Sequence, residues 1–435
     1  MKTPISIFWF RRDIRLYDNV GLSKALHDDF PVLPIFIFDT EILEGLPKND
    51  ARISFIYKTL QKIRIELQTF GSDVAIYCGK PEVIFKELIA TLAIQCVYTN
   101  RDYEPYAQQR DLTIKELLLA NNIGFRTYKD QVIFEKNEIV KKDGTPYVVF
   151  TPYMKRWKAS FSKSIQLKAS PVHSLYGNLL QFESSHEKTL IDIGFEPSSI
   201  EVPNFDITPT TIQNYHETRN IPALDGTSHL GPHLRFGTIS IRTVIQKAIA
   251  EKNEVFWQEL IWREFFMQIL WHFPETIKNA FRKKYDRIVW RNNDIEFSAW
   301  KEGKTGYPLV DAGMRQLNAT GYMHNRVRMI VASFLCKHLL IDWRWGEAYF
   351  AEKLLDYELA SNIGNWQWAA GSGVDAAPYF RIFNPTTQIE KFDPDFEYIR
   401  KWVQEFDTKD YPTKIVDHKE ARARALATYK TALSN

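Results

Sequence analysis

The stretch "LASNIGNWQWAAGSG", residues 359–373, sets two tryptophans, Trp366 and Trp368, among amides and small residues. A core segment would surround an indole, the largest side chain, with aliphatic residues. Aromatic faces stack on flat ligands, and an amide can hydrogen-bond the edge of a ring. Asn362 therefore has two open interpretations: it caps a helix near Ser361, or it offers its amide to a cofactor ring.

A second group of residues falls in "WQELIWRE", where Glu259, Trp262 and Arg263 stand at i, i+3 and i+4 on one helix face. A Glu–Arg pair with this spacing is commonly a surface ion pair. The tryptophan between them is unusual there, because a flat indole can stack a nucleobase while the carboxyl reads its edge. Both interpretations stay open at this stage.

Two further motifs carry polar groups. "GYMHNRVRM" offers Asn325, Arg326 and Arg328, and these residue types read base edges and phosphates. His324 is expected to be structural and no metal is predicted, since no second His or Cys stands at a ligand spacing. The Gly-Thr-Ser at 226–228 precedes a helical stretch, which suits either a bound phosphate or an ordinary N-cap by Thr227 or Ser228.

The elements that must position these residues differ along the chain. Short apolar runs at 5–10, 32–39, 74–78 and 95–100, with a weaker one at 124–130, alternate with helical patterns. One of these helical patterns, residues 51–71, ends at Gly71. This alternation predicts βαβ units and a Rossmann-like parallel sheet. No GxGxxG follows the first run, so the usual dinucleotide fingerprint is missing.

The rest of the chain has a different pattern. Residues 131–204 are polar and rich in Pro and Ser, which indicates a connector. Beyond residue 205 the period is helical, with long amphipathic helices predicted at 255–273 and 324–341 and no further strand. We therefore predict an α/β domain at 1–130, a connector at 131–204 and an all-α domain at 205–435.

Charge and aromatic content are concentrated in the second half of the chain. The net charge is only +3, but residues 226–345 hold 18 Lys or Arg and 11 Asp or Glu. Ten of the twelve tryptophans lie after residue 250. A basic, tryptophan-rich region fits a polyanion with flat bases, and equally fits a solvated helical surface.

The remaining composition points to a cytoplasmic location. No apolar run reaches the roughly 18 residues of a membrane span, and the N-terminus lacks the features of a signal peptide. The three cysteines, Cys78, Cys96 and Cys336, form no CxxC motif, which fits a reducing compartment. Three cysteines also exclude a four-cysteine iron–sulfur cluster held by this chain alone.

The order and the exact residues of the motifs, taken together, are more specific for a protein family than any single motif. The diagnostic stretches are "FWFRRDIRLYDN", "GTSHLGPHLRFG", "ELIWREF", "WKEGKTGYPLVDAGMRQLNATGYMHNRVRM", "LLIDWRWGEAYF" and "NWQWAAGSGVDAAPYFRIFNPTTQ". Through them the chain resembles the photolyase/cryptochrome family over residues 5–405, most specifically at 300–392. It looks most like the class I bacterial photolyases that repair cyclobutane pyrimidine dimers, which implies an antenna-type α/β domain, a helical FAD-binding domain and a monomer.

The resemblance implies a FAD site in the helical domain. Asn362 matches the asparagine that faces the reactive flavin nitrogen, where its amide oxygen favours a reduced, protonated flavin. The chain departs from the family at Phe256, Glu358 and Ile363, which leaves the redox tuning of the flavin open. The implied FAD-binding residues are Tyr215, Thr227, Ser228, His229, Leu230, Gly231, Phe256, Arg263, Arg328, Asp356, Tyr357, Glu358 and Asn362.

Electron transfer and DNA binding follow from the same resemblance. Trp366 matches the tryptophan nearest the flavin in the family's photoreduction chain, and Trp343 and Trp290 match its next members. Glu259 matches the acid that hydrogen-bonds a pyrimidine carbonyl; to donate it must be protonated, and we expect burial against Trp262 to raise its pKa. The implied lesion- and DNA-facing residues are Arg219, Glu259, Trp262, Asn325, Arg326, Met329, Trp368, Arg381 and Gln388.

The implied activity is light-driven DNA repair. A pyrimidine dimer is flipped out of DNA, photoexcited reduced FAD gives it an electron, the ring opens and the electron returns; Glu259, Asn362 and Met329 are the expected catalytic residues. A cryptochrome-type blue-light photoreceptor and a non-catalytic flavoprotein that binds nucleic acid are the alternatives. A second, antenna chromophore (folate, deazaflavin or flavin) is left open, with Glu104 at a position that folate-binding relatives use.

Overall fold

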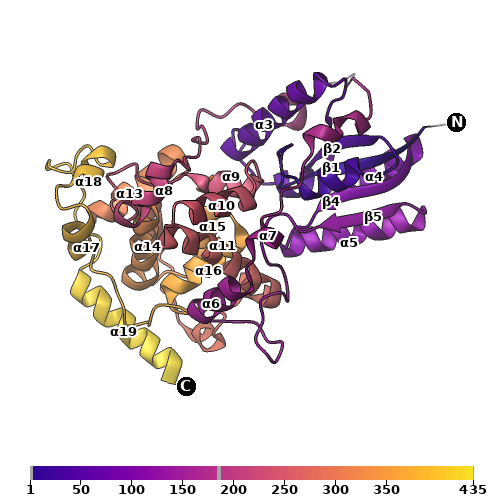
Figure 1. The fold of residues 1–435 in the computed structure, drawn as a ribbon. Helices are drawn as coiled ribbons and strands as arrows, with labels where there is room; N and C mark the ends of the chain where they lie inside the picture. Colours follow the sequence, from indigo (N-terminus) through magenta and orange to yellow (C-terminus); the bar gives the residue numbers. More distant parts are fainter. Residues whose placement is uncertain (1–2, 184–187, 435) are drawn as a thin grey trace. The chain divides into compact units, whose positions relative to one another are not determined.

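The chain folds into two compact units, each built from three separate segments (Figure 1). A computed structural model describes residues 3–183 and 188–434. The first unit comprises Met1–Glu138, Ser160–Phe205 and His229–Lys247; the second comprises Ile139–Ala159, Asp206–Ser228 and Ala248–Asn435. The predicted connector thus contributes to both units, and the predicted domain boundaries at 130 and 205 stay a prediction.

The first unit contains the predicted parallel sheet, including the weak fifth strand. Its order is β3-β2-β1-β4-β5, and every neighbouring pair is parallel. The chain order therefore reverses between β1 and β4, as in doubly wound folds. The strands are β1 (Pro4–Phe10), β2 (Val32–Asp39), β3 (Ala75–Gly79), β4 (Ala93–Asn100) and β5 (Gly124–Tyr128).

Helices cover both faces of this sheet because alternate residues of each strand point to opposite sides. Phe8 and Phe10 of β1 pack in one core cluster with α1 and α3, whereas Ile7 and Trp9 pack in another with α4 and α5. The helices of this unit are α1 (Val20–Leu26), α2 (Thr40–Leu43), α3 (Ala51–Gln68), α4 (Pro81–Thr91), α5 (Pro105–Ala120), α7 (Lys163–Gln166), η1 (His173–Asn178), η2 (Ile191–Ile193), α9 (Leu230–Phe236) and α10 (Ile241–Ala250).

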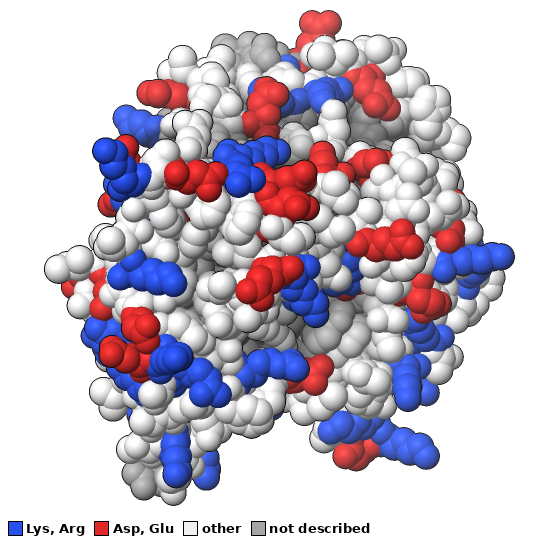
Figure 2. Space-filling model, turned by 90° about the vertical axis from the view of Figure 1, so that its left-hand side faces the viewer, with Lys and Arg blue, Asp and Glu red and all other residues white. Residues whose placement is uncertain are grey.

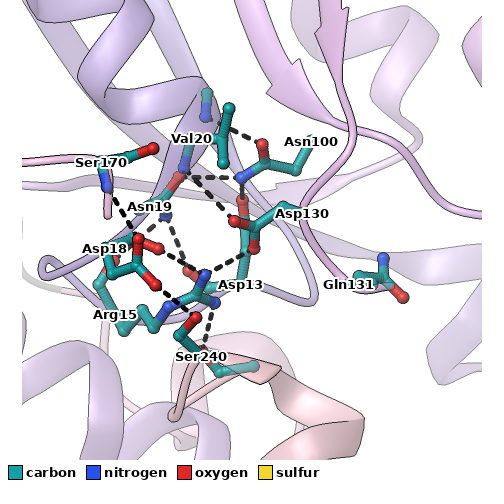
Figure 3. A network of polar contacts seen from close by, with 12 residues as sticks. Asp13, Arg15, Asp18, Asn19, Val20, Asn100, Asp130, Gln131, Ser170 and Ser240 are labelled. Carbon is teal, nitrogen blue, oxygen red and sulfur yellow. Dashed lines mark hydrogen bonds and ion pairs between the residues drawn. The ribbon is translucent and has the colours of Figure 1, made fainter. Parts of the chain in front are cut away.

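A buried polar network fills the carboxyl ends of β1 and β4 (Figure 3). Asn100, the last residue of β4, donates its amide to Asp13 at 2.6 Å and to Asn19 at 2.8 Å. Arg15 lies 2.6 Å from Asp130, an aspartate that follows β5. In open α/β sheets a ligand commonly enters where the strand order reverses. Here the protein's own polar side chains occupy that position.

Arg242, at the start of α10, ties the segment 229–247 to this network. Its guanidinium lies 2.9 Å from Asp18 and 2.9 Å from Asp130. Asp18 also accepts a 2.8 Å hydrogen bond from the backbone of Ser170. Two arginines and two aspartates are thus paired where they are largely shielded from water, which explains why α9 and most of α10, up to Lys247, belong to the first unit.

The second unit is helical, and no strand follows residue 205 among the described residues. Its main core cluster gathers side chains from α12 to α18 around Trp300, Trp343 and Trp366. The helices are α6 (Phe150–Ser160), α8 (Pro209–Thr218), α11 (Glu254–His272), η3 (Pro274–Ile277), η4 (Lys283–Arg287), α12 (Asp294–Glu302), α13 (Pro308–Thr320), α14 (Asn325–Ser333), η5 (Phe334–Leu339), α15 (Trp343–Lys353), α16 (Leu359–Ala370), α17 (Pro385–Phe392), α18 (Glu397–Trp402) and α19 (His418–Ser434).

Two details of the predicted helices are wrong. The helix expected to be amphipathic forms as α11, but residues 264–270 are buried on every side. Glu264 is tolerated there because it accepts a 2.5 Å hydrogen bond from the indole of Trp157. The helix expected at 324–341 is α14 followed by η5, a π-helical turn. In the described parts of the chain, no helix has the length and apolarity to span a membrane.

Candidate functional site

A cavity in the second unit brings most of the sequence-predicted site residues together. It is bounded by α14, α15, α16 and the loop before α16, and protein atoms leave about 600 Å³ free within it, part of it open to solvent. Nine predicted residues line it: Asn325, Arg328, Met329, Asp356, Tyr357, Glu358, Asn362, Trp366 and Trp368.

Six lining residues were missed by sequence reasoning: Ala332, Phe350, Leu354, Ser361, Asn365 and Ala369. Helical spacing would have found several of them. Asn362, Asn365, Trp366 and Ala369 follow an i, i+3, i+4, i+7 pattern, which defines one face of α16. Phe350 and Leu354 gave no such signal, because they reach the cavity from α15 and its C-terminal end.

The amide of Asn362 has a fixed orientation in this cavity. Asn362 lies inside α16, whose N-cap is Glu358, so the capping interpretation is wrong. Its Nδ2 donates to the backbone carbonyl of Glu347 at 3.1 Å and to the Glu347 carboxyl at 2.9 Å. Both N–H donors are therefore used, and Oδ1 is left to accept a hydrogen bond from a ligand N–H.

Ion pairs hold the loop that precedes α16. Arg328 of α14 binds Asp356 with both guanidinium Nη atoms, at 3.2 and 2.9 Å, and donates its Nε to the carbonyl of Met323 at 2.7 Å. The expected Arg328–Asp356 pair is therefore present. Arg263 of α11 lies 3.8 Å from the Glu358 carboxylate, whose side chain is 8% exposed. The loop is consequently anchored to α14, which lines the cavity, and to α11.

The three tryptophans of the expected electron chain differ in burial. Trp366 and Trp343 are each 2% exposed and belong to the main core cluster, while Trp290 is half-buried and packs against it. Trp366 meets Phe350 edge-on at 4.9 Å, and Trp290 meets Tyr429 edge-on at 6.1 Å. Trp366, which lines the cavity, is thus enclosed. Trp290, which is expected at the far end of the electron chain, reaches the surface.

Glu259 and Trp262 of α11 do not line the cavity, and both have partners within the second unit. The Glu259 carboxylate accepts a 2.5 Å hydrogen bond from Arg219. Trp262 stacks on Phe150 of α6 with ring centres 3.6 Å apart and an angle of 9° between the planes. Phe150 covers one face of this indole, and its distance in sequence concealed the contact.

The N-terminus of α14 is organised by His324, as expected for a structural histidine. Its Nδ1 accepts a 3.2 Å hydrogen bond from the backbone of Arg326. Burial, with Arg328 and Arg326 nearby, lowers the pKa of His324 to about 4, so the ring is neutral at physiological pH. Arg326 donates to Asn220 at 2.6 Å and lies over the ring of Phe392.

The other expected FAD-binding residues lie outside the lining of the cavity. Tyr215 meets Phe256 edge-on at 5.2 Å, and the Thr227 hydroxyl lies 3.1 Å from that of Tyr322. The N-cap of α9 is His229, with φ of 50° and no side-chain cap, so the interpretation of Thr227 or Ser228 as N-cap is wrong. His229, Leu230 and Gly231 belong to the first unit.

The remaining DNA-facing and antenna positions are not among the residues that line the cavity. Arg381 is exposed, and Gln388 on α17 is half-buried. Figure 2 shows cationic and anionic side chains interspersed on the face that it presents, so charge alone does not mark a DNA-binding surface there. In the first unit, Glu104 is engaged by Arg12 at 3.1 Å and by Arg235 at 2.7 Å.

Comparison with known proteins assigns the family. The family described as FAD binding domain of DNA photolyase matches residues 256–409, and the one described as DNA photolyase matches residues 6–172. A protein of Agrobacterium fabrum named deoxyribodipyrimidine photo-lyase is 37% identical, over 99% of this chain and 98% of its own. The chain belongs to the DNA photolyase family. The Escherichia coli photolyase is 35% identical, over 98% of each chain.

Solved photolyase structures share the fold. A bacterial class III photolyase from Agrobacterium tumefaciens aligns with a TM-score of 0.89 at 35% identity, over 100% of this chain and 99% of its own. An archaeal photolyase from Sulfolobus tokodaii, described with two FAD molecules, reaches 0.82 at 34% identity, over 98% and 99%. A Synechocystis cryptochrome reaches 0.83 at 25% identity, over the same shares. The family is thus confirmed, while the class I assignment stays a prediction.

The cavity suits the FAD that this family binds. All fifteen residues that line it lie within the segment matched by the FAD-binding family. The Asn362 amide presents an acceptor, the Arg328–Asp356 pair fixes one wall, and Trp366 supplies a buried indole. Such a donor set fits a flat, nitrogen-containing ring with a protonated edge.

Proposed function

We propose that this protein repairs cyclobutane pyrimidine dimers in DNA under light, with reduced FAD held against α14 and α16. The observation that carries the proposal is the content of one cavity. It presents the Asn362 acceptor together with Asn325, Met329 and Trp368, the residues expected at the lesion. The relatives named deoxyribodipyrimidine photo-lyase support the same substrate.

The chain's own residues bind, orient and exclude water. The Asn362 oxygen accepts from the protonated edge of the ring, and its amide is held for that task by Glu347. Trp368 offers an aromatic face to the extruded bases, and such stacking is worth roughly 1–3 kcal/mol per base. When bound and reduced, FAD supplies the light-driven electron that opens the cyclobutane ring and takes it back.

Glu259 acts through an exchange of partners. In the free protein its carboxylate is bound by Arg219 at 2.5 Å. Arg219 is also an expected DNA contact, and a phosphate competes for the same guanidinium. We infer that DNA binding draws Arg219 away, which frees the Glu259 carboxyl to hydrogen-bond a pyrimidine of the dimer.

The three tryptophans serve light-driven reduction of the cofactor, not repair itself. Trp290→Phe is expected to block photoreduction of oxidised FAD, because phenylalanine is far harder to oxidise than indole. Repair by chemically reduced protein is expected to stay nearly unchanged, since the repair electron does not pass through this residue. Equal loss of both activities in Trp290→Phe would show that the two roles are not separate.

A repair assay tests the proposed function against a cryptochrome-type photoreceptor, which the similarity to the Synechocystis protein keeps in view. Reduced protein is mixed with DNA carrying one thymine dimer, and dimer loss is measured under blue light and in the dark. We expect light-dependent repair whose excitation spectrum follows reduced flavin. Trp368→Phe is expected to slow repair, and Trp402→Phe, outside the cavity, serves as the matched control. Light-induced flavin chemistry without dimer loss would exclude the repair function.

A further inference from the structure

A basic surface segment of the second unit carries the outermost tryptophan of the proposed chain. Residues 278–291 hold six Lys or Arg and one acidic residue, Asp286. That acid is already paired with Arg344 at 2.7 Å, so its charge is compensated. The exposed cations of the segment that form no ion pair in the described structure are Lys278, Arg282, Lys283, Lys284 and Arg287.

Apolar side chains stand beside these cations. Val289 is 79% exposed and Ile295 is 82% exposed, on either side of the half-buried Trp290. Single exposed aliphatic residues are ordinary, but these two belong to the same segment as the residue at which an electron must enter the chain. Asp294 adds one exposed negative charge, and Glu296 is neutralised by Arg291 at 2.7 Å. We name residues 278–295 the Trp290 surface.

The charge and the apolar side chains together define the partner. We propose that the Trp290 surface docks an acidic one-electron carrier protein, which refills the tryptophan chain after photoreduction; this rests on the proposed function. Unpaired cations attract an acidic surface and raise its encounter rate. Exposed aliphatic side chains in the same segment suit a small protein interface of the electron-transfer kind, which buries less than about 1,200 Å².

Observations favour a protein over DNA at this surface. A phosphate backbone pairs with cations but gives no cover to Val289 and Ile295, which lie beside them. Trp290 is half-buried and packs against the buried ring of Tyr429, so only part of its indole is open to an extruded base. The residues expected to face DNA, Arg219, Arg326 and Arg381, lie on other segments of the unit.

The redox balance of the proposed step is simple. Photoreduction removes one electron from Trp290 and leaves an indole radical cation. The carrier transfers one electron to that indole, which returns to its neutral closed-shell form, and the carrier is oxidised by one electron. No proton and no bond is exchanged between the two proteins. Each turn leaves the tryptophan chain intact and the cofactor richer by one electron, so two turns take oxidised FAD to the reduced form that repair requires.

The test uses full-length, FAD-loaded protein and a reduced plant-type [2Fe–2S] ferredoxin as the acidic probe. A light flash generates the tryptophan radical, and its decay is followed by transient absorption at increasing ferredoxin concentration and two salt concentrations. Reduced cytochrome c, a basic protein, is the charge control. In the dark, binding is measured separately by NMR titration of labelled ferredoxin, which needs no photochemistry.

We expect ferredoxin to accelerate the decay in proportion to its concentration, and salt to slow this reaction by about tenfold or more. Lys283→Glu with Lys284→Glu is expected to lower both the rate constant and the dark affinity by about tenfold. The matched control Lys401→Glu with Lys409→Glu makes the same charge change at exposed lysines on α18 and after it, and is expected to leave both unchanged.

Distinct outcomes separate the surface from the electron chain. A radical that forms normally but decays independently of ferredoxin, or equally fast in the two double variants, overturns the docking proposal and leaves the proposed function standing. A radical absent even without ferredoxin shows that the tryptophan chain itself fails, which overturns the docking proposal and the roles assigned to the three tryptophans but not the repair function, which the separate dimer assay tests. If reversing the charge at Lys283 and Lys284 weakens DNA binding and not ferredoxin binding, the surface contacts DNA and the proposal is wrong.

Discussion

Lys337 is a buried lysine whose removal is expected to stabilise the protein. It lies in η5, is 1% exposed, and donates its Nζ to the carbonyls of Ala370 at 2.9 Å and Tyr379 at 3.4 Å. The same Nζ lies 3.8 Å from the ring centre of Tyr429. Burial lowers the pKa of Lys337 from its ordinary 10.5 to about 7. The folded protein therefore binds this proton more weakly than the unfolded chain.

The size of the effect follows from the two pKa values. Their gap of about 3.5 corresponds to about 5 kcal/mol against folding at low pH, at about 1.36 kcal/mol per pKa unit. The interaction of the charged Lys337 with the Tyr429 ring stabilises the folded state by about 2 kcal/mol. Near pH 6 the charged Lys337 thus costs about 3 kcal/mol of folding free energy. This cost declines as pH rises towards 10.5, because the unfolded chain then also loses the proton.

The assay is the free energy of unfolding of Lys337→Met in urea at pH 6 and pH 9.5. We expect the free energy of unfolding of the variant to exceed that of wild type by about 3 kcal/mol at pH 6 and by only about 1 kcal/mol at pH 9.5. Lys409→Met, at an exposed position, is the control and is expected to change stability by less than about 0.5 kcal/mol at both. A variant that is less stable than wild type at pH 6 would refute the reasoning, since the bonds to the two carbonyls would then outweigh burial.

Two further predictions concern the cavity and the DNA face. A methyl added at Gly346 would lie 2.1 Å from the Trp366 ring, so Gly346→Ala is expected to cost about 1–3 kcal/mol and to slow photoreduction, measured by denaturation and flash absorption. Gly177→Ala, whose methyl meets nothing within 4 Å, is the control; equal behaviour of the two variants would contradict the clash. Arg219→Gln is expected to weaken the binding of damaged and undamaged DNA alike and to reduce the salt slope of binding by about one. If anisotropy titrations showed weaker binding of dimer-containing DNA alone, Arg219 would instead act only through Glu259.

Much of the fold follows from local sequence patterns. Apolar runs of strand length separated by helical periods were enough to predict the parallel sheet, including the weak strand that became β5. The helical second half followed from its period. The composition of the two units did not follow, because segment 229–247 joins the first unit through pairs such as Arg242–Asp130, which lie 112 residues apart. Long-range ion pairs leave no local periodicity.

The candidate site was predictable only in part, and mainly through family resemblance. Nine of the expected residues line one cavity, which no spacing rule could have shown, since they come from α14, α16 and a loop. The contact between Trp262 and Phe150 spans 112 positions and was missed. The pairing of Glu259 with Arg263 on its own helix was likewise inferred from local spacing, whereas the structure pairs Glu259 with Arg219 at the C-terminal end of α8.

The orientation of Asn362 shows what the three-dimensional arrangement adds. From sequence, this amide served equally well as a helix cap or as a ligand contact. Glu347, fifteen positions earlier on a different helix, receives both of its N–H bonds and decides between the two. The same pairing also determines which atom remains for the ligand, because an amide with both hydrogens engaged presents only its oxygen. Glu347, a residue that no motif singled out, therefore orients the oxygen that must accept a hydrogen bond from a reduced, protonated ring.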